Sequence, residues 1–213
     1  MFTFAWRIKR VNAYQKEQLE ALNSVRVYFS TLTREQIGAL KEKTIDYIAF
    51  RKQVDLFLNR YFDEICTENC YKNRLSACCS KDGIITFFAD TVINCLFADE
   101  KQLDRMASRL LGSNEGFKCV YLDHDGCLWS IKPIVCAMFL CENAKKEVFL
   151  IKPEAEQIWK ALRRKERSFK WPDKPVLFDM LETCFLNAGY KSSLMHLNNS
   201  PGLLNVKRKA GLI

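Results

Sequence analysis

The chain has 213 residues, of which 48% are hydrophobic, and a formal net charge of +8. This length is enough to bury a core without disulfide staples, and no apolar run approaches the roughly 20 residues that a membrane span needs. The N-terminal sequence MFTFAWRIKRV begins apolar and turns basic, the reverse of a secretory signal peptide. We therefore expect a cytoplasmic protein without a membrane partner.

The basic excess lies toward the C-terminus. Residues 152–174 carry 8 basic and 4 acidic side chains, and Lys207, Arg208 and Lys209 follow in the last residues. Such a segment is able to attract nucleic acid or another anionic partner. A solvated helix face followed by a basic tail explains the same pattern, so we do not favour a nucleic-acid partner.

Helical patterns fill the first third of the chain. We expect a helix over residues 12–29. Thr33 and Gln36 stand at the two ends of a capping-box pattern, and apolar side chains recur at helical spacing over 37–65. The sequence therefore predicts one long helix that runs directly into Cys66.

A loop and two helices are predicted next. Residues 71–83 lack periodicity and are interpreted as a loop. Residues 84–96 are mostly apolar and predict a helix. A second helix is predicted over 99–111, because Gly112 follows as a typical C-terminal cap.

The segment from Cys119 to Trp129 predicts a β-hairpin. Asp125 and Gly126 supply the residues that tolerate positive φ in a tight turn. Such a turn brings Cys119 close to Cys127.

The rest of the chain is predicted to be helical. Pro133 suits the first turn of a helix, which we expect to carry both Cys136 and Cys141. Two more helices are expected at about 153–168 and 175–188. The whole is thus a mainly α protein with one short hairpin. We divide it into a cysteine-rich domain, residues 1–150, and a basic C-terminal extension, residues 151–213.

Cysteine is concentrated in the middle of the chain. Eight of its ten cysteines are Cys66, Cys70, Cys78, Cys79, Cys119, Cys127, Cys136 and Cys141. In a chain without an export signal, thiols this dense indicate a soft metal ion, a cluster or redox chemistry rather than disulfides. The adjacent pair Cys78–Cys79 also argues against a disulfide framework, because neighbouring cysteines bridge each other only with strain.

The number of thiols leaves the number of sites open. Zinc and iron–sulfur sites usually take about four protein ligands in a tetrahedral array. Eight thiolates suit two four-ligand sites, one multinuclear site, or one site with spare thiols. Spacing alone does not choose among the three.

The cysteine pattern resembles the YkgJ-type cysteine-cluster family, over about residues 60–145. The second half matches closely: a cysteine, a Gly-Cys turn, a basic residue with proline, and C-x-x-F-x-C. These are Cys119, Gly126-Cys127, Lys132-Pro133, Cys136, Phe139 and Cys141. The first half, CTENC-YKNRLSA-CC, keeps the family's order with longer gaps. Lys132 stands where the family usually has arginine.

The resemblance implies a zinc- or iron-chelating domain that binds its metal through the eight cysteines. We expect a structural metal at the centre of a helical fold. An iron–sulfur enzyme is the alternative, because related motifs occur in proteins similar to flagellin lysine methylases. The sequence shows no Gly-rich phosphate loop, no HExxH, no convincing Ser-His-Asp arrangement, and no recognisable S-adenosylmethionine or nicotinamide fingerprint. Whether the protein is an enzyme is therefore left open.

Three further residues are interpreted as lying outside the ligand set. Cys95 and Cys184 lie on apolar, helix-like stretches and are expected to pack in the core. His124 lies in the predicted turn and is expected to be exposed, with metal coordination or support of a ligand as the alternative.

Overall fold

The computed structural model describes residues 11–76, 78–80, 85–114, 116–170 and 177–195. Helices dominate these residues, and one two-stranded antiparallel sheet accompanies them, which confirms the predicted mainly α fold with a short hairpin. In the same residues, no helix is both long enough and apolar enough to cross a membrane. The elements are α1 (Ala13–Ser30), α2 (Arg34–Lys43), α3 (Ile45–Phe62), η1 (Asp63–Lys72), α4 (Phe88–Phe97), α5 (Glu100–Leu111), β1 (Leu122–Asp123), β2 (Gly126–Cys127), α6 (Ile134–Ala137), α7 (Glu142–Ile151), α8 (Pro153–Lys170) and α9 (Leu177–Asn187).

The first two helices begin at side-chain caps that can be read in the sequence. The side chain of Asn12 accepts a hydrogen bond from the N–H of Gln15 at 2.8 Å, and the Gln15 side chain accepts one from the N–H of Asn12. Thr33 and Gln36 form the predicted capping box of α2. Each box pairs backbone donors that the first helical turn leaves without partners.

The prediction of one long helix over 37–65 is wrong, because the helix is divided at Thr44. The Thr44 hydroxyl donates to the carbonyl of Lys41 at 2.7 Å. A threonine that bonds to the carbonyl of the preceding turn competes with regular helix geometry. After Phe62 the helix widens into η1, a π-helix with i→i+5 hydrogen bonds, which continues to Lys72.

The two helices predicted in the middle of the chain are present. The first, predicted over 84–96, begins later, at Phe88, and residue 84 lies outside the described part. The second, α5, is capped at its start by the side chain of Asp99 and ends at Gly112 as predicted.

The hairpin is present, but its loop differs by one residue from the prediction. Asp123 pairs with Gly126, so the loop consists of His124 and Asp125 rather than Asp125 and Gly126. Gly126 has a φ of +119°, a conformation that glycine adopts readily because it has no Cβ. The prediction of a residue with positive φ at Gly126 is therefore confirmed. Its predicted place in the loop is wrong, because Gly126 pairs with Asp123 in the strand.

The single helix predicted to carry both late cysteines is wrong. Pro133 precedes α6 with an extended backbone, and α6 is only one turn long, ending at Ala137. It carries Cys136 alone. Cys141 has φ −68° and ψ 155° and is the residue that precedes α7, a helix that the sequence reading did not separate.

The two C-terminal helices are present as α8 and α9, while residues 171–176 between them lie outside the described part. The predicted domain boundary at residue 150 falls within α7, which ends at Ile151. Separate folding of the two parts stays a prediction.

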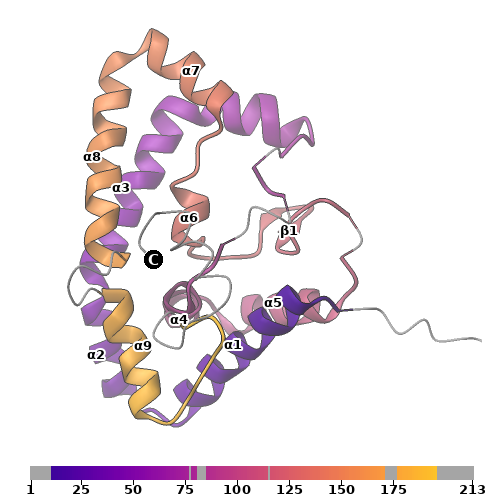
Figure 1. The fold of residues 1–213 in the computed structure, drawn as a ribbon, viewed down its shortest axis with the longest axis vertical. Coiled ribbons are helices and arrows are strands. Elements are labelled where there is room, and N and C mark those ends of the chain that lie inside the picture. Colours follow the sequence, from indigo (N-terminus) through magenta and orange to yellow (C-terminus); the bar gives the residue numbers. More distant parts are fainter. Residues whose placement is uncertain (1–10, 77, 81–84, 115, 171–176, 196–213) are drawn as a thin grey trace, which may run out of the picture.

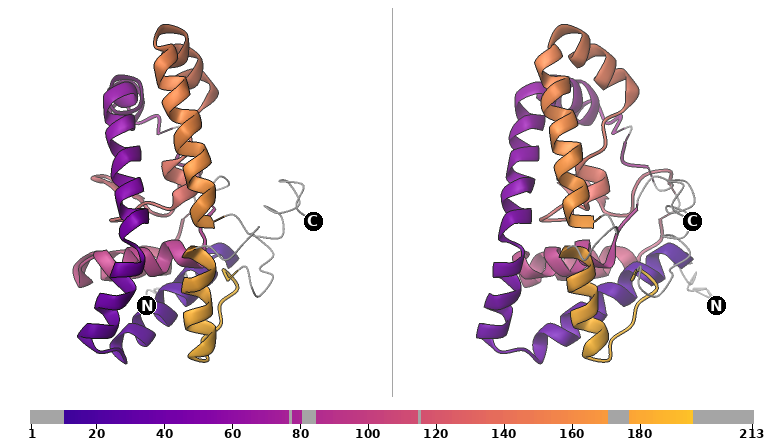
Figure 2. Two further views of the ribbon diagram at one scale, coloured as in Figure 1. Left: turned by 90° about the vertical axis from the view of Figure 1, so that its left-hand side faces the viewer. Right: turned by 60° about the vertical axis from the view of Figure 1, so that its left-hand side comes forward.

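The larger hydrophobic cluster is built around α3 and α8, which run antiparallel, side by side, in Figures 1 and 2. Phe57 stacks on Trp159 with ring centroids 5.5 Å apart, and Phe50 stacks on Phe169 at 5.3 Å. Buried residues of α4, α6, α7 and α9 complete this cluster. Residues from both sides of position 150 therefore share one apolar core.

The smaller hydrophobic cluster lies under the hairpin. It joins Leu22 of α1 and Met106 of α5 to residues that flank the strands. Tyr121 meets Trp129 edge to face, with ring centroids 5.2 Å apart. This cluster is the base on which the cysteines of the hairpin are held.

Candidate metal centre

The first two motif cysteines lie on η1, at the end of α3. Cys66 is exposed and Cys70 is half-buried. At the junction of α3 and η1, Phe62 meets Phe149 of α7 with ring centroids 5.8 Å apart. The π-helix therefore presents its thiols beside α7.

The chain turns back immediately after η1. The carbonyl of Cys70 accepts hydrogen bonds from the N–H of Leu75 at 2.9 Å and of Ser76 at 3.3 Å. Arg74 and Ser76 both have positive φ. This conformation allows the sharp reversal of the chain, but it is unfavourable for residues other than glycine. This reversal returns the loop that carries Cys78 toward η1.

The two halves of the cysteine motif are joined through the backbone. The carbonyl of Cys79 accepts a hydrogen bond from the N–H of Cys119 at 3.0 Å. The next residues outward, Ser80 and Lys118, form an antiparallel bridge, and the Lys118 ammonium donates to the carbonyl of Ser76 at 3.1 Å. Residues some 40 positions apart in sequence are thus adjacent at the cysteine motif.

Backbone N–H groups point at two of the hairpin sulfurs. The N–H of Tyr121 donates to Cys119 Sγ at 3.4 Å, and the N–H of Trp129 donates to the sulfur of Cys127. Burial raises the pKa of the Cys127 thiol, and this hydrogen bond partly offsets the rise. A hydrogen bond donated to sulfur favours the thiolate, which is the form that binds metal.

Buried polar side chains fix the loop that leads into Cys136. Asn94 of α4, which is 0% exposed, accepts a hydrogen bond from the N–H of Ile131 at 3.0 Å. Arg51 of α3 donates to the carbonyl of Lys132 at 2.6 Å.

Asp90 holds the same loop at a third point. One carboxylate oxygen accepts from the N–H of Ile134 at 3.0 Å, and the other accepts from the N–H of Phe87 at 3.0 Å. Burial raises the pKa of Asp90 to about 6. Burial, and next the Asp90 carboxylate, raise the pKa of Cys136 to about 12.

The sequence reading missed all three of these supporting residues. A signal was present for two of them, because Asp90 and Asn94 are polar residues four apart within an otherwise apolar stretch, 87–97. Side chains at i and i+4 share a helix face. Arg51 gave no such signal, since it lies among other charged residues of α3.

The thiols of η1, of the doublet and of α7 affect one another. Burial raises the pKa of Cys66 to about 11, and Cys78, Cys141 and Cys70 add to the rise in that order. Nearby negative charges disfavour the ionised form of a thiol, so these cysteines oppose one another's deprotonation.

Other motif cysteines also affect the pKa of Cys79. A hydrogen bond from the Cys78 thiol lowers the pKa of Cys79, against burial and the nearby Cys119, Cys127 and Cys136, all of which raise it. Burial raises the pKa of Cys119 to about 11, with a further contribution from Cys127.

The structure contains the thiols that a metal site needs, but they lie too far apart to hold a metal ion. All ten cysteines fall in the described part of the chain, and every one is a free thiol. Over those same described residues, no three His, Cys, Asp or Glu side chains are close enough together to hold a metal ion. Eight thiols on four neighbouring segments nonetheless fit zinc or iron in ligand type, so binding would require the thiols to draw closer.

The two remaining cysteines lie in apolar surroundings, as predicted. Cys95 packs against both hydrophobic clusters, and burial raises its pKa to about 12. Cys184 packs against the larger cluster, with its sulfur 3.5 Å from the hydroxyl of Tyr28.

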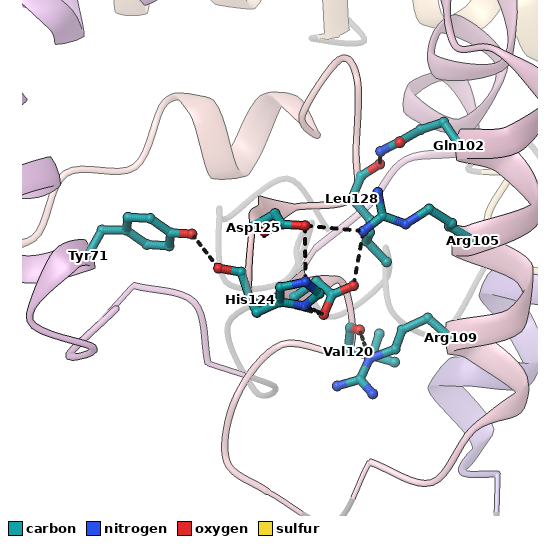
Figure 3. A network of polar contacts seen from close by, with 9 residues as sticks. Tyr71, Gln102, Arg105, Arg109, Val120, His124, Asp125 and Leu128 are labelled. Atoms are coloured by element: carbon teal, nitrogen blue, oxygen red, sulfur yellow. Dashed lines mark hydrogen bonds and ion pairs between the residues drawn. The ribbon is translucent and has the colours of Figure 1, made fainter.

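His124 lies at the exposed tip of the hairpin, with a side chain that is 78% exposed (Figure 3). Its Nδ1 lies 2.8 Å from a carboxylate oxygen of Asp123, and its Nε2 lies 3.1 Å from one of Asp125. Both ring nitrogens therefore contact carboxylates, which confirms the expectation of an exposed turn residue. The Asp123 hydrogen bond, and next the Asp125 charge, raise the pKa of His124.

The same network fastens the hairpin to its neighbours (Figure 3). Arg105 of α5 reaches Asp123 at 3.2 Å and Asp125 at 3.9 Å. On the other side, the hydroxyl of Tyr71 in η1 donates to the carbonyl of His124 at 3.3 Å. The hairpin is thereby held between α5 and the π-helix.

Comparison with known protein families, curated proteins and solved structures found no match. The resemblance to the YkgJ-type family stays a prediction from the cysteine motif.

Proposed function

We propose that the protein binds zinc or iron through the thiolates of the eight motif cysteines, and that the metal is structural. The observation that carries this proposal is the 3.0 Å hydrogen bond from the Cys119 N–H to the Cys79 carbonyl. It makes neighbours of two cysteine-bearing segments that are 40 positions apart, in a fold whose thiols are all free. Packing alone has no need of such a concentration of sulfur at one place.

The residues around the thiols suit this role. Asn94, Asp90 and Arg51 anchor the loop before Cys136. A metal ion bound by Cys136 would therefore be attached to a segment whose backbone is already held in place. Of the two η1 thiols, that of Cys66 is exposed. A bound zinc ion would supply a redox-inert, roughly tetrahedral cross-link between these segments, and its binding energy would add to folding stability.

An iron–sulfur protein with redox or methylase-like activity is the second candidate. The N–H groups of Tyr121 and Trp129 that point at the sulfurs of Cys119 and Cys127 favour it, because hydrogen bonds to cysteine sulfur tune the reduction potential of a cluster. They also favour zinc, so the metal itself has to be identified.

Elemental analysis and an absorption spectrum of protein purified without oxygen test both candidates. Zinc gives a colourless protein, whereas an iron–sulfur cluster gives a brown one with broad visible absorption. A matched sample carrying Cys184→Ser should hold the same metal as the unchanged chain. Folded protein with no zinc or iron above the level of a buffer blank would contradict the proposal.

Nucleic-acid binding by the basic C-terminal segment remains unfavoured. On α8, Lys160 lies 2.8 Å from Glu156, and Lys170 lies 2.6 Å from Glu166. Part of the basic charge of this helix is thus paired within the helix. Residues 207–209 lie outside the described part of the chain.

A further inference from the structure

Lys118 belongs to the segment that enters the hairpin, and its side chain reaches back to the loop that leads into the doublet Cys78–Cys79. Its ammonium donates hydrogen bonds to two successive carbonyls of that loop, those of Leu75 and Ser76, the second at 3.1 Å. A lysine ammonium has three donors and can serve both carbonyls at once. One side chain therefore holds residues that lie 43 and 42 positions earlier in the sequence.

The carbonyl of Ser76 is the point where this side chain meets the backbone of the doublet. The same oxygen accepts a hydrogen bond from the N–H of Cys79 at 2.9 Å. The carbonyl of Cys79 in turn accepts one from the N–H of Cys119 at 3.0 Å, and Cys119 follows Lys118 in the chain. These hydrogen bonds and the chain itself thus close a ring that begins and ends at Lys118 and contains the backbone of Cys79.

The loop held in this way has an unfavourable backbone conformation of its own. Arg74 and Ser76 have φ values of +59° and +38°, which residues other than glycine adopt only where surrounding contacts hold them. On one side, the N–H groups of Leu75 and Ser76 bond to the carbonyl of Cys70. On the other side, the carbonyls of the same two residues bond to Lys118. The ammonium is thus one of the contacts on which the position of the doublet depends.

Lys118 is itself fixed through its backbone. It forms an antiparallel bridge with Ser80, and the side-chain amide of Asn114 donates to its carbonyl at 3.1 Å. The residue is exposed, so its replacement leaves no cavity in the core. A change of this side chain should therefore act on the loop and leave the rest of the fold intact.

We propose that Lys118 is a positioning residue of the metal centre: it provides no ligand, but it holds the doublet Cys78–Cys79 beside Cys119 and thereby raises the affinity for metal. This inference rests on the proposed function and goes further, because it assigns a role to a side chain without sulfur. Segments that are already held in place lose less conformational freedom when a ligand orders them. Without the ammonium, part of the binding free energy would have to order this loop.

Amide hydrogen exchange of the metal-free protein tests whether Lys118 holds the loop. Lys118→Met keeps an unbranched side chain and loses the ammonium. In this variant the N–H groups of Cys79 and Cys119 should exchange about three- to tenfold faster, the loss expected for one exposed hydrogen-bonding group. Lys118→Arg retains a cationic donor and should restore most of the protection. Amides in the middle of α3 should keep their rates, because the opening is local.

Two results of this experiment would overturn the inference. Unchanged exchange at both Cys79 and Cys119 in Lys118→Met would show that the ammonium does not hold the doublet. An equal increase in α3 would show a global loss of stability in place of a local opening.

Zinc affinity, measured by competition with a chelator, tests the consequence for the metal. Lys118→Met should bind as many zinc ions as the unchanged chain, since no thiol is lost, but about three- to tenfold more weakly. Lys118→Arg should lie close to the unchanged chain. Lys43→Met is the matched control, because Lys43 is an exposed lysine in the last turn of α2, and its zinc affinity should not change.

Failure of the inference and failure of the proposed function give different results. Equal zinc affinity in Lys118→Met and the unchanged chain would overturn the inference alone. Fewer zinc ions per folded molecule of Lys118→Met would also overturn it, because a positioning residue changes affinity and not the number of ligands. An unchanged chain that binds no zinc or iron would refute the proposed function, and with it the role of Lys118 at the metal.

Discussion

Replacement of Asn94 by alanine should destabilise the protein more than its size suggests. Asn94 is fully buried in α4, and its side-chain oxygen is the partner of the Ile131 N–H in the loop before Cys136. Its amide nitrogen also lies 3.3 Å from the sulfur of Met106. The change therefore removes the bond that fastens this loop to α4.

The expected loss follows from three contributions. Leaving the Ile131 N–H without a partner costs about 1–3 kcal/mol. The space vacated by the amide group, roughly 40 Å³, costs about 1 kcal/mol at ~24 cal/mol per Å³. Alanine returns up to about 0.7 kcal/mol through its higher helix propensity. The free energy of unfolding should therefore fall by about 1.3–4 kcal/mol.

Asn23→Ala is the matched control, because Asn23 is an exposed asparagine within α1. It gains the same helix propensity without losing a buried partner, so its stability should be unchanged or up to about 0.7 kcal/mol higher. Urea unfolding of both variants, followed by far-ultraviolet circular dichroism on metal-loaded protein, measures the difference. If the two variants differed by less than about 1 kcal/mol, the anchoring role assigned to Asn94 would be wrong.

Further predictions concern the thiols, the hairpin tip and the C-terminal helices. Cys184→Ser should leave metal content unchanged and cost about 1–3 kcal/mol of stability, because a hydroxyl replaces a thiol in apolar surroundings; metal loss in this variant would contradict the ligand assignment. NMR titration should place the pKa of His124 above 6.5 and show a decrease in Asp123→Asn. Because the pKa of His124 is raised and that of Asp123 is lowered to about 2, the ion pair should persist between those two values and be lost as pH rises through the His124 pKa; an unshifted histidine would refute it. Truncation after residue 150 should leave any chain that stays folded with its full metal content but expose apolar faces of α3 and α4, seen as increased binding of a hydrophobic dye, since α8 and α9 complete their core.

Local signals in the sequence predicted much of the helical framework. The Thr33 capping box, the Asp99 start and the Gly112 end of α5 are all set by residues within one helical turn, so they can be recognised without knowledge of the fold. The choice of glycine at position 126 is of the same kind, because its φ of +119° constrains the residue type locally, although its pairing with Asp123 was not predicted.

Features that depend on distant contacts were not predictable in the same way. Apolar periodicity continues across Thr44, and α2 ends there because the N–H and the hydroxyl of Thr44 both bond to the carbonyl of Lys41. The end of α6 after Ala137, where the N–H of Met138 bonds to the carbonyls of Cys136 and Ile134, likewise leaves no mark in the apolar pattern. In the candidate site, the cysteines can be recognised by residue type alone. Arg51 cannot, because its bond to the carbonyl of Lys132 joins residues 81 positions apart.

Two helices belong to both hydrophobic clusters, and this has a consequence for how the molecule should melt. In α1, Val25 faces the larger cluster and Leu22 the smaller one. In α4, Val92 lies in the larger cluster while Asn94 reaches Met106 of the smaller one. Neither cluster can come apart without disturbing a helix that the other needs. Heating should therefore give one cooperative calorimetric transition. A ligand that binds to and stabilises the hairpin should raise the melting temperature of the distant helix α9 as much as that of the hairpin.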